Sequence, residues 1–210
     1  MSDAGEESRD ISDATRVSAL ADGVFAIVMT LLVLGLEVPE VPDELIADEL
    51  FREILLLWPL IVAYVVSFLV LGIYWMGHHT QFHFLRGVDR TGLWINILLF
   101  MFVSLVPFTT KMVGEYSGQE IALLLYGTNL LAISLMLLAH WLYAARAGLL
   151  KPSTANETKK KVTRQILIGA TVFAAGMGMA FVQPAWSLFV FLLVPGLHIL
   201  PGPIHLHWTR

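Results

Sequence analysis

Six long apolar segments, separated by short charged stretches, constrain this chain more than any other feature of its sequence. At a rise of about 1.5 Å per residue, a helix needs about 20 apolar residues to cross the hydrocarbon core of a bilayer. Most of the segments meet that length and the last is the shortest; they cover residues 17–36, 54–77, 91–110, 121–145, 165–183 and 185–200. Only 14% of the 210 residues are charged, whereas soluble domains carry about a quarter. We therefore predict an all-α integral membrane protein with six transmembrane helices.

The basic residues between these segments predict the orientation of the chain. With six spans, both termini share one side of the membrane with the second and fourth connections. That side carries eleven basic residues: Arg9, Arg16, Arg86, Arg90, Arg146, Lys151, Lys159, Lys160, Lys161, Arg164 and Arg210. The other side carries only Arg52 and Lys111. Because Lys and Arg are enriched in cytoplasmic loops, we predict a multi-pass protein of the cell (inner) membrane with both termini in the cytoplasm.

Several classes of function lack the residues that their chemistry requires. The chain has no cysteine, which removes disulfides and thiolate catalysis. Its formal net charge is -4 and its basic residues form no stripe with interleaved aromatics, so we expect no nucleic-acid partner. Signatures such as G-x-S-x-G and glycine-rich phosphate loops are missing. Because these catalytic signatures are missing, we do not expect an enzyme. The N-terminal stretch MSDAGEESRDISDA is acidic and no small-residue cleavage site follows the first apolar segment, so we do not expect a cleaved signal peptide.

Three histidines near the end of the second segment raise the possibility of a metal site. His79 and His83 are four residues apart, on one helical face, and His78 lies beside them in YWMGHHTQFHFLR. The other histidines do not repeat this spacing: His140, His198, His205 and His207. We favour histidines that hydrogen-bond to neighbouring helices, and we expect no bound metal and no cofactor.

The two main connections on the external side have distinct chemistry. Residues 37–53, EVPEVPDELIADELFRE, carry seven carboxylates against Arg52, a formal charge of -6. Such a segment raises the local cation concentration if several copies ring one entrance, and is otherwise a solvated acidic loop. Residues 110–118, TKMVGEYSG, partly match the Thr-Val-Gly-Tyr-Gly filter of potassium channels. Glu115 interrupts the match and no pore helix precedes it, so we interpret this stretch as an ordinary polar turn.

Arg16 and Asp22 place charge where the first apolar segment begins. They are six residues apart and point about 120° away from each other on a helix, so they are not an i,i+4 pair. The polar groups expected at the same depth are Trp75, His78 and His79. We infer a polar latch between the first and second helices. The alternative is that Arg16 reaches lipid phosphates and Asp22 is only hydrated.

Further along the first segment, Ile27, Leu31 and Leu34 follow helical spacing and form one aliphatic face, with the hydroxyl of Thr30 beside it. Periodicity alone does not distinguish a face that contacts lipid or another helix from one that lines a pore.

Two stretches of the first half resemble a known family. RVSALADGVFAIVMTLLVLGLEVP, residues 16–39, is similar to the first-helix signature of the prokaryotic relatives of the lysosomal potassium channel transmembrane protein 175. That signature has an Arg before Phe-Ser-Asp, then Gly-Val-Phe-Ala-Ile and Thr-Leu-Leu-Val-Leu; here Leu20 and Ala21 replace its Phe and Ser. Residues 74–110, YWMGHHTQFHFLRGVDRTGLWINILLFMFVSLVPFTT, are similar to its pattern of Trp, paired His, Asp, Trp-x-Asn and Pro-Phe.

The resemblance implies a homotetramer of six-helix subunits whose first helices line a central pore. Ile27, Leu31 and Leu34 then fall at the family's hydrophobic constriction, and the Thr30 hydroxyl faces the ion path. The implied function is passive and modestly selective permeation of potassium ions through the bilayer, with protons as a second candidate ion.

The chain then divides into a cytoplasmic tail (1–12), a six-helix transmembrane channel domain (13–205) and a C-terminal tail (206–210). The alternative is a secondary transporter of a cation or small solute. Such a protein is expected to have paired broken helices near the midplane, and apart from its prolines the sequence has no clear pair.

Overall fold

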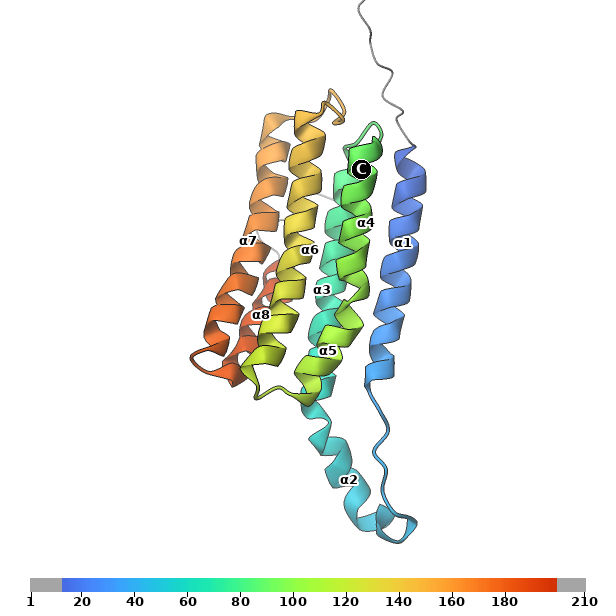
Figure 1. Ribbon diagram of the computed structural model, residues 1–210, viewed down its shortest axis with the longest axis vertical. Coiled ribbons are helices and arrows are strands. Elements are labelled where there is room, and N and C mark those ends of the chain that lie inside the picture. Colours follow the sequence, from blue (N-terminus) through green and yellow to red (C-terminus); the bar gives the residue numbers. More distant parts are fainter. Residues whose placement is uncertain (1–12, 200–210) are drawn as a thin grey trace, which may run out of the picture.

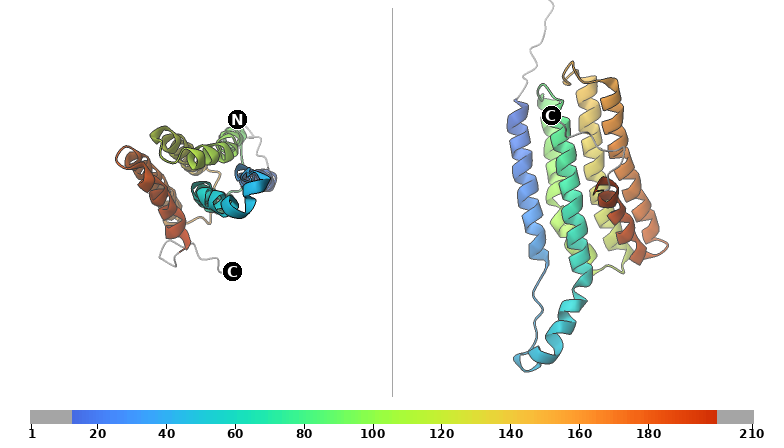
Figure 2. Two further views of the ribbon diagram at one scale, coloured as in Figure 1. Left: turned by 90° about the horizontal axis from the view of Figure 1, so that it is seen from below. Right: turned by 180° about the vertical axis from the view of Figure 1, so that it is seen from behind.

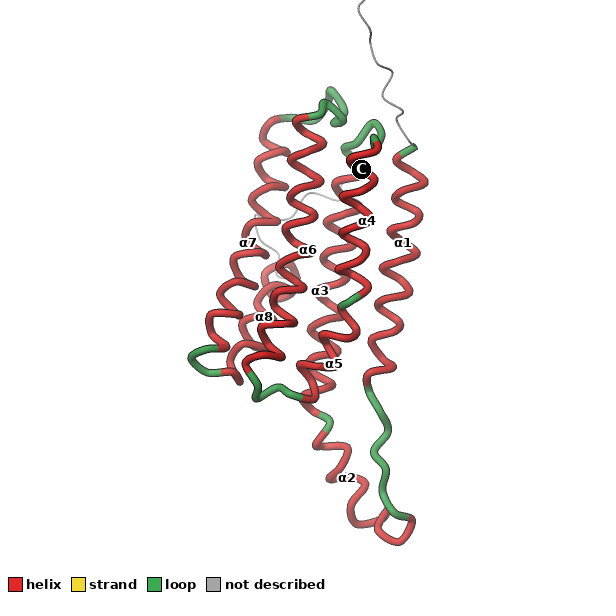
Figure 3. Tube along the Cα trace, viewed as in Figure 1, coloured by secondary structure: helices red, strands yellow, loops and turns green. Residues whose placement is uncertain are grey.

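The computed structural model describes residues 13–199, which form a bundle of helices joined by short loops (Figure 3). The elements are α1 (Ala14–Leu31), η1 (Leu32–Gly35), η2 (Asp43–Leu45), α2 (Ile46–Leu56), α3 (Trp58–His83), α4 (Arg90–Ser104), α5 (Val106–Glu115), α6 (Glu120–Arg146), α7 (Asn156–Ala180) and α8 (Pro184–Ile199). Within residues 13–199, five stretches are long and apolar enough to cross a membrane: Ala14–Gly35, Trp58–His83, Arg90–Glu115, Glu120–Arg146 and Asn156–Ala180. The prediction of an all-α, multi-pass membrane protein is confirmed. The apolar part of α8, Trp186–Leu197, is shorter.

Local sequence explains where several helices begin. Asp13 caps α1 by accepting a hydrogen bond from the Thr15 amide, which lowers the pKa of this carboxyl. Asp89 caps α4 in the same way through the amide of Gly92. Pro59 and Pro107 lie in the first turns of α3 and α5. Because proline has no amide hydrogen, it is tolerated there and interrupts a helix that would otherwise continue.

Two predicted boundaries were wrong, and one predicted span is divided into two helices. The second span begins at Trp58, and the preceding acidic stretch contains a separate helix, α2, in which apolar positions recur at helical spacing among the carboxylates. The third span is divided into α4 and α5 just before Pro107. The fifth helix begins at Asn156, well before the apolar stretch, because lysines favour helix and their long side chains reach out of the hydrocarbon.

The spanning helices lie side by side, with α1 at one edge of the bundle and α7 at the other (Figures 1 and 2). The connections from α3 to α4 and from α6 to α7 lie at the same end as the start of α1, whereas α2 projects beyond the opposite end (Figure 1). α6 packs against α4, α5 and α7, and α1 packs against α3 and α4. α8 turns back along α7 but ends partway along it (Figure 2).

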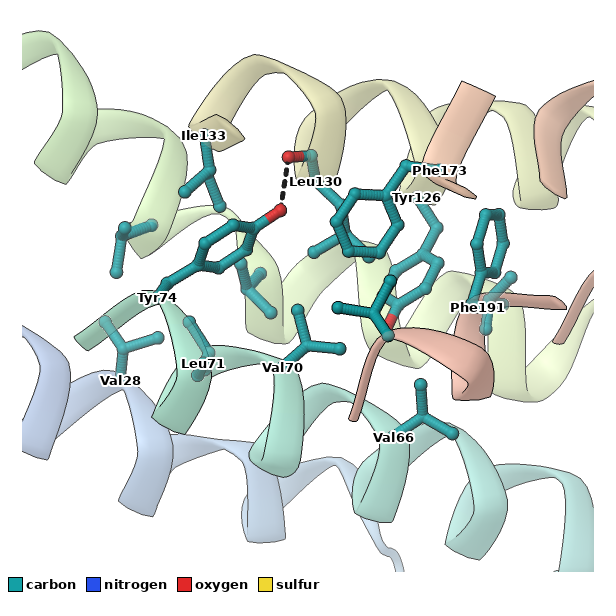
Figure 4. Packing of buried hydrophobic residues seen from close by; sticks show 14 of the residues in the cluster. Val28, Val66, Val70, Leu71, Tyr74, Tyr126, Leu130, Ile133, Phe173 and Phe191 are labelled. Atoms are coloured by element: carbon teal, nitrogen blue, oxygen red, sulfur yellow. Dashed lines mark hydrogen bonds between the residues drawn. The ribbon is translucent and has the colours of Figure 1, made fainter. Parts of the chain in front are cut away.

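Large aromatic side chains fill the centre of the bundle (Figure 4). Tyr126, Phe173 and Phe191 are fully buried and bring α6, α7 and α8 together through ring contacts. Tyr74 of α3 donates a hydrogen bond to the Leu130 carbonyl of α6 (Figure 4). Gly176 makes the α7–α8 contact possible, since a Cβ there would collide with the ring of Phe191. The core therefore joins all the long helices, and α1 contributes one face to it through Ala21, Phe25 and Val28.

Candidate functional site

α1 has two faces with different surroundings. Its buried face recurs every three to four residues and packs against α3 and α4; its members are Val17, Ala21, Phe25, Val28 and Leu32. On the other face Ile27, Leu31 and Leu34 are 60%, 43% and 70% exposed. The predicted aliphatic stripe therefore lies on the outer surface of a single subunit, at the edge of the bundle.

Thr30 lies on the same exposed face of α1. Its hydroxyl donates a 2.8 Å hydrogen bond to the backbone carbonyl of Ile27. Because the hydroxyl donates its proton within the helix, Oγ1 keeps its lone pairs, with which it can accept a hydrogen bond from water or contact a cation. Leu34 follows in the short 3-10 helix η1, after α1 has ended at Leu31.

Asp22 and Trp75, two of the predicted latch residues, are in direct contact. The indole nitrogen of Trp75 on α3 donates a 2.7 Å hydrogen bond to Oδ1 of Asp22 on α1. The His79 ring lies 6.0 Å from that of Trp75, between centroids, one turn further along α3. These side chains form a polar bridge between α1 and α3 on the exposed side of α3.

His78 and Arg16 do not join this bridge within one subunit. His78 is 1% exposed and points into the bundle, where its Nε2 lies 2.9 Å from Oδ1 of Asn96 on α4. Asn96 Nδ2 donates to the Gly92 carbonyl, so its Oδ1 is the acceptor and Nε2 of His78 carries the proton. Arg16 is exposed, and its guanidinium makes no ion pair or hydrogen bond with another residue of the described 13–199 region.

Comparison with known proteins identifies the family. The sequence profile described as endosomal/lysosomal potassium channel TMEM175 matches residues 16–107. A protein named potassium channel from Streptomyces collinus is 34% identical over 183 residues, which are 85% of this chain and 87% of that protein. The chain belongs to the TMEM175 family.

Further TMEM175 relatives cover most or part of the chain. A protein named potassium channel from Chamaesiphon minutus is 31% identical over 182 residues, 84% of this chain and 89% of that one. The crystal structure of a lysosomal potassium-selective channel TMEM175 homolog from Chamaesiphon minutus has a TM-score of 0.78 at 28% identity, covering 88% of this chain and 95% of that one. The human endosomal/lysosomal proton channel TMEM175 is 33% identical over 109 residues, half of this chain and 22% of that protein.

All nine predicted site residues lie inside the stretch that the TMEM175 profile matches. The fold itself adds polar contacts that sequence reasoning missed. Gln81 of α3 lies 2.9 Å from Nδ1 of the buried His140 on α6, and Tyr143 of α6 donates to the Asp89 carboxylate. The signal that could have found them is a polar side chain inside an apolar segment, since such a group needs a partner on a neighbouring helix.

A second missed group lies nearer the end of the bundle from which α2 projects. Ser67 of α3 shares hydrogen bonds of 2.8 Å with Tyr126 of α6 and 2.7 Å with Thr110 of α5. All three are buried, so they lock α3, α5 and α6 together.

At the same end, Lys111 of α5 forms an ion pair with Glu37, just after η1, and a second with Glu115. The Lys111 ammonium lowers the pKa of the Glu37 carboxyl below its ordinary value. This ion pair ties the end of the first span to α5.

The histidine pair does not extend to a metal-ligand set in the described part of the chain. Within residues 13–199, no three His, Asp or Glu side chains come close enough together to hold a metal ion. His205 and His207 lie outside the described residues.

Proposed function

We propose that this chain is the subunit of a potassium channel in which four copies surround a central pore lined by α1. The observation that carries the proposal is the exposed aliphatic face of α1 in a member of a family whose relatives are named potassium channels. One subunit places this face at its edge, where it cannot enclose a path for ions. A closed ring of subunits makes the face the wall of a conduit.

In this arrangement α8 is the sixth transmembrane helix and both termini lie in the cytoplasm. The basic residues of the α3–α4 and α6–α7 connections, at the end of the bundle where α1 begins, support this orientation under the positive-inside rule. The channel domain spans residues 13–205 in the cell membrane. The tails, 1–12 and 206–210, and the end of this domain after residue 199 lie outside the described residues.

Ion passage follows from the chemistry of the α1 face. Four copies each of Ile27, Leu31 and Leu34 form stacked apolar rings that offer no ligand to replace lost hydration. Potassium sheds its water at lower cost than sodium, so such a neck favours potassium modestly. Beside these rings, the hydroxyl oxygens of Thr30, one from each copy, are the oxygen ligands that the α1 face offers to an ion. Protons are a second permeant ion, because a narrow neck that wets transiently holds a chain of water.

The Asp22–Trp75 bridge positions this face. It attaches α1 to α3 through a charge-assisted hydrogen bond and thereby fixes the rotation of α1 about its own axis. Arg16, which is exposed in one subunit, contributes to the same polar layer by contacting a neighbouring copy.

Flux through purified protein tests this function. The protein is reconstituted into potassium-loaded vesicles, and a potassium gradient is imposed with no other solute gradient. A passive channel dissipates the gradient under these conditions. Flux that requires a co-transported ion or solute supports the alternative, a secondary transporter, and contradicts the proposal.

A further inference from the structure

Two hollows lie next to each other along α3, and each is lined in part by a residue of α8. The first has a volume of about 270 Å³ and lies between α3, α6 and α7. The second has a volume of about 170 Å³ and lies between α3, Met29 of α1 and Pro195 of α8. Ile73 and Met76 line both hollows. They are two parts of one groove along α3, called the α3 groove below.

The α3 groove changes from polar to apolar along its length. Thr80, Gln81 and Gln165 line the end near the α6–α7 connection, whereas the far end is lined only by apolar residues and Gly72. From Thr80 to Leu69 the helix advances eleven positions, or about 16 Å at 1.5 Å per residue. That length is about half of a 30 Å hydrocarbon core. The groove therefore spans one leaflet, with its polar end toward the membrane surface.

Glycines keep the α3 groove open. A Cβ placed on Gly72, Gly77 or Gly169 would meet no atom within 4 Å. At Gly176, by contrast, a Cβ would collide with Phe191. The glycines of the groove thus face open space instead of a packed helix. An empty space of this size between apolar walls loses dispersion contacts, so an apolar group that fills it stabilises the protein.

Positive charge lies above the polar end of the α3 groove. Lys159 lies three positions before the lining residue Val162, and Lys161 lies four positions before the lining residue Gln165. Each lysine is therefore one helical turn away from a residue that lines the groove, on the same side of α7 as that residue. Long side chains on a helix point toward its N-terminus, which brings both ammonium groups to the membrane surface. The N-terminus of α7 adds its own positive potential, against one carboxylate, Glu157, in the first turn.

We infer that the α3 groove binds an acyl chain of an anionic phospholipid from the cytoplasmic leaflet, with the headgroup phosphate held by Lys159 and Lys161. The inference rests on the proposed orientation, which places this end of the bundle in the cytoplasm. It does not depend on which ion the protein conducts.

Binding is tested with full-length protein in detergent, using phosphatidylglycerol and phosphatidylcholine as probes and counting bound lipids by native mass spectrometry. Gly169→Leu and Gly77→Leu each place a side chain in the α3 groove. We expect each to reduce bound phosphatidylglycerol at least tenfold. Gly178→Leu is the matched control, because Gly178 is exposed on the same helix outside the groove and its Cβ also meets no atom within 4 Å. We expect Gly178→Leu to bind as much phosphatidylglycerol as the wild type.

The headgroup is tested separately. The double variant Lys159→Gln, Lys161→Gln should lose the preference for phosphatidylglycerol over phosphatidylcholine and still bind either lipid. Lys160→Gln removes one charge from the opposite side of α7, where it should leave the preference intact.

Unchanged phosphatidylglycerol binding in both groove-filling variants overturns the inference, as does equal loss in the Gly178 control. If the groove-filling variants change the oligomeric mass but not the amount of bound lipid, a second copy of the chain occupies the groove, and the inference is overturned as well. Lipid binding that is seen only after removal of residues 200–210 would also overturn the inference. Protein that binds lipid as expected but passes no ion in vesicles contradicts the proposed function alone.

Discussion

At the scale of single residues, polar side chains in this protein act by joining helices that apolar contacts alone would leave free to rotate. Adjacent residues serve different neighbours: Trp75 binds Asp22 of α1, whereas His78 turns inward to Asn96 of α4. Sequence spacing identified Asp22 and Trp75 as partners because both stand at the same depth. It could not separate the roles of His78 and His79, since the rotation of α3 depends on the whole bundle.

Replacing Trp75 by Phe tests the α1–α3 bridge. The variant keeps most of the aromatic surface but leaves Asp22 without its indole donor. We expect a loss of about 1 to 2 kcal/mol in the free energy of unfolding, because a hydrogen bond to a charged group contributes about 1.5 to 3 kcal/mol and solvent screens part of it at this exposed site. Thermal unfolding in detergent measures it. Trp94→Phe on α4 is the control, since Trp94 is also exposed and its indole makes no hydrogen bond within residues 13–199; equal losses in both variants would contradict the role of the bridge.

The Glu37–Lys111 ion pair predicts a pH effect outside the membrane. Because Lys111 lowers the pKa of Glu37, the pair is intact at neutral pH and is lost as the pH falls through that lowered pKa. In Lys111→Gln the pKa of Glu37 should therefore rise toward its ordinary value. Carbon-13 NMR of labelled carboxylates measures it, with the resonance assigned by its disappearance in Glu37→Gln. An unchanged pKa would show that the two groups do not interact in solution.

At the scale of elements, the apolar pattern predicts which segments cross the membrane more reliably than where each helix begins and ends. The fourth span was predicted closely because α6 is apolar and uninterrupted. α2 was missed because its carboxylates and Arg52 interrupt the apolar residues, so that no continuous apolar run forms; the helical spacing of Ile46, Leu50 and Ile54 is the signal that marks it. α2 has no buried residue, and Phe51 is 73% exposed.

The α7–α8 contact gives an element-scale prediction. Gly176→Ala adds a Cβ that collides with the Phe191 ring in a fully packed region, which forces α8 away from α7. Overpacking of this kind costs about 1 to 3 kcal/mol, measured as a lower melting temperature in detergent. Gly178→Ala, two residues further along α7 and exposed, should change the melting temperature by far less. Equal effects of the two substitutions would contradict the close packing at Gly176.

At the scale of the whole molecule, the subunit leaves its first helix half covered. α1 contributes one face to the core that it shares with the other spanning helices, but it lies at the edge of the bundle and exposes its aliphatic stripe (Figures 1 and 2). Sequence alone could identify the stripe, because its spacing is regular. It could not decide what covers the stripe, since lipid and a neighbouring subunit accept the same apolar side chains.

Assembly is predicted to depend on Arg16. If Arg16 contacts a neighbouring copy, Arg16→Ala should lower the fraction of tetramer and leave the melting temperature of the isolated subunit unchanged. Mass measurement of the protein in detergent or native membrane gives both the oligomeric state and the effect of the substitution. Wild-type protein that remains a monomer, or a dimer with no larger species, would contradict the pore.

Single-channel conductance of Ile27→Asn and Leu31→Asn in planar bilayers tests the pore-lining role of α1 most directly. In a neck built from four copies of these residues, Asn admits water and supplies amide dipoles where the wild type strips the ion of hydration. We predict larger potassium currents per tetramer and a weaker preference for potassium over sodium. Leu167→Asn, an exposed position on α7 at the opposite edge of the subunit, is the control and should leave conductance unchanged. Wild-type conductance and selectivity in both α1 variants would contradict the assignment of α1 to the ion path.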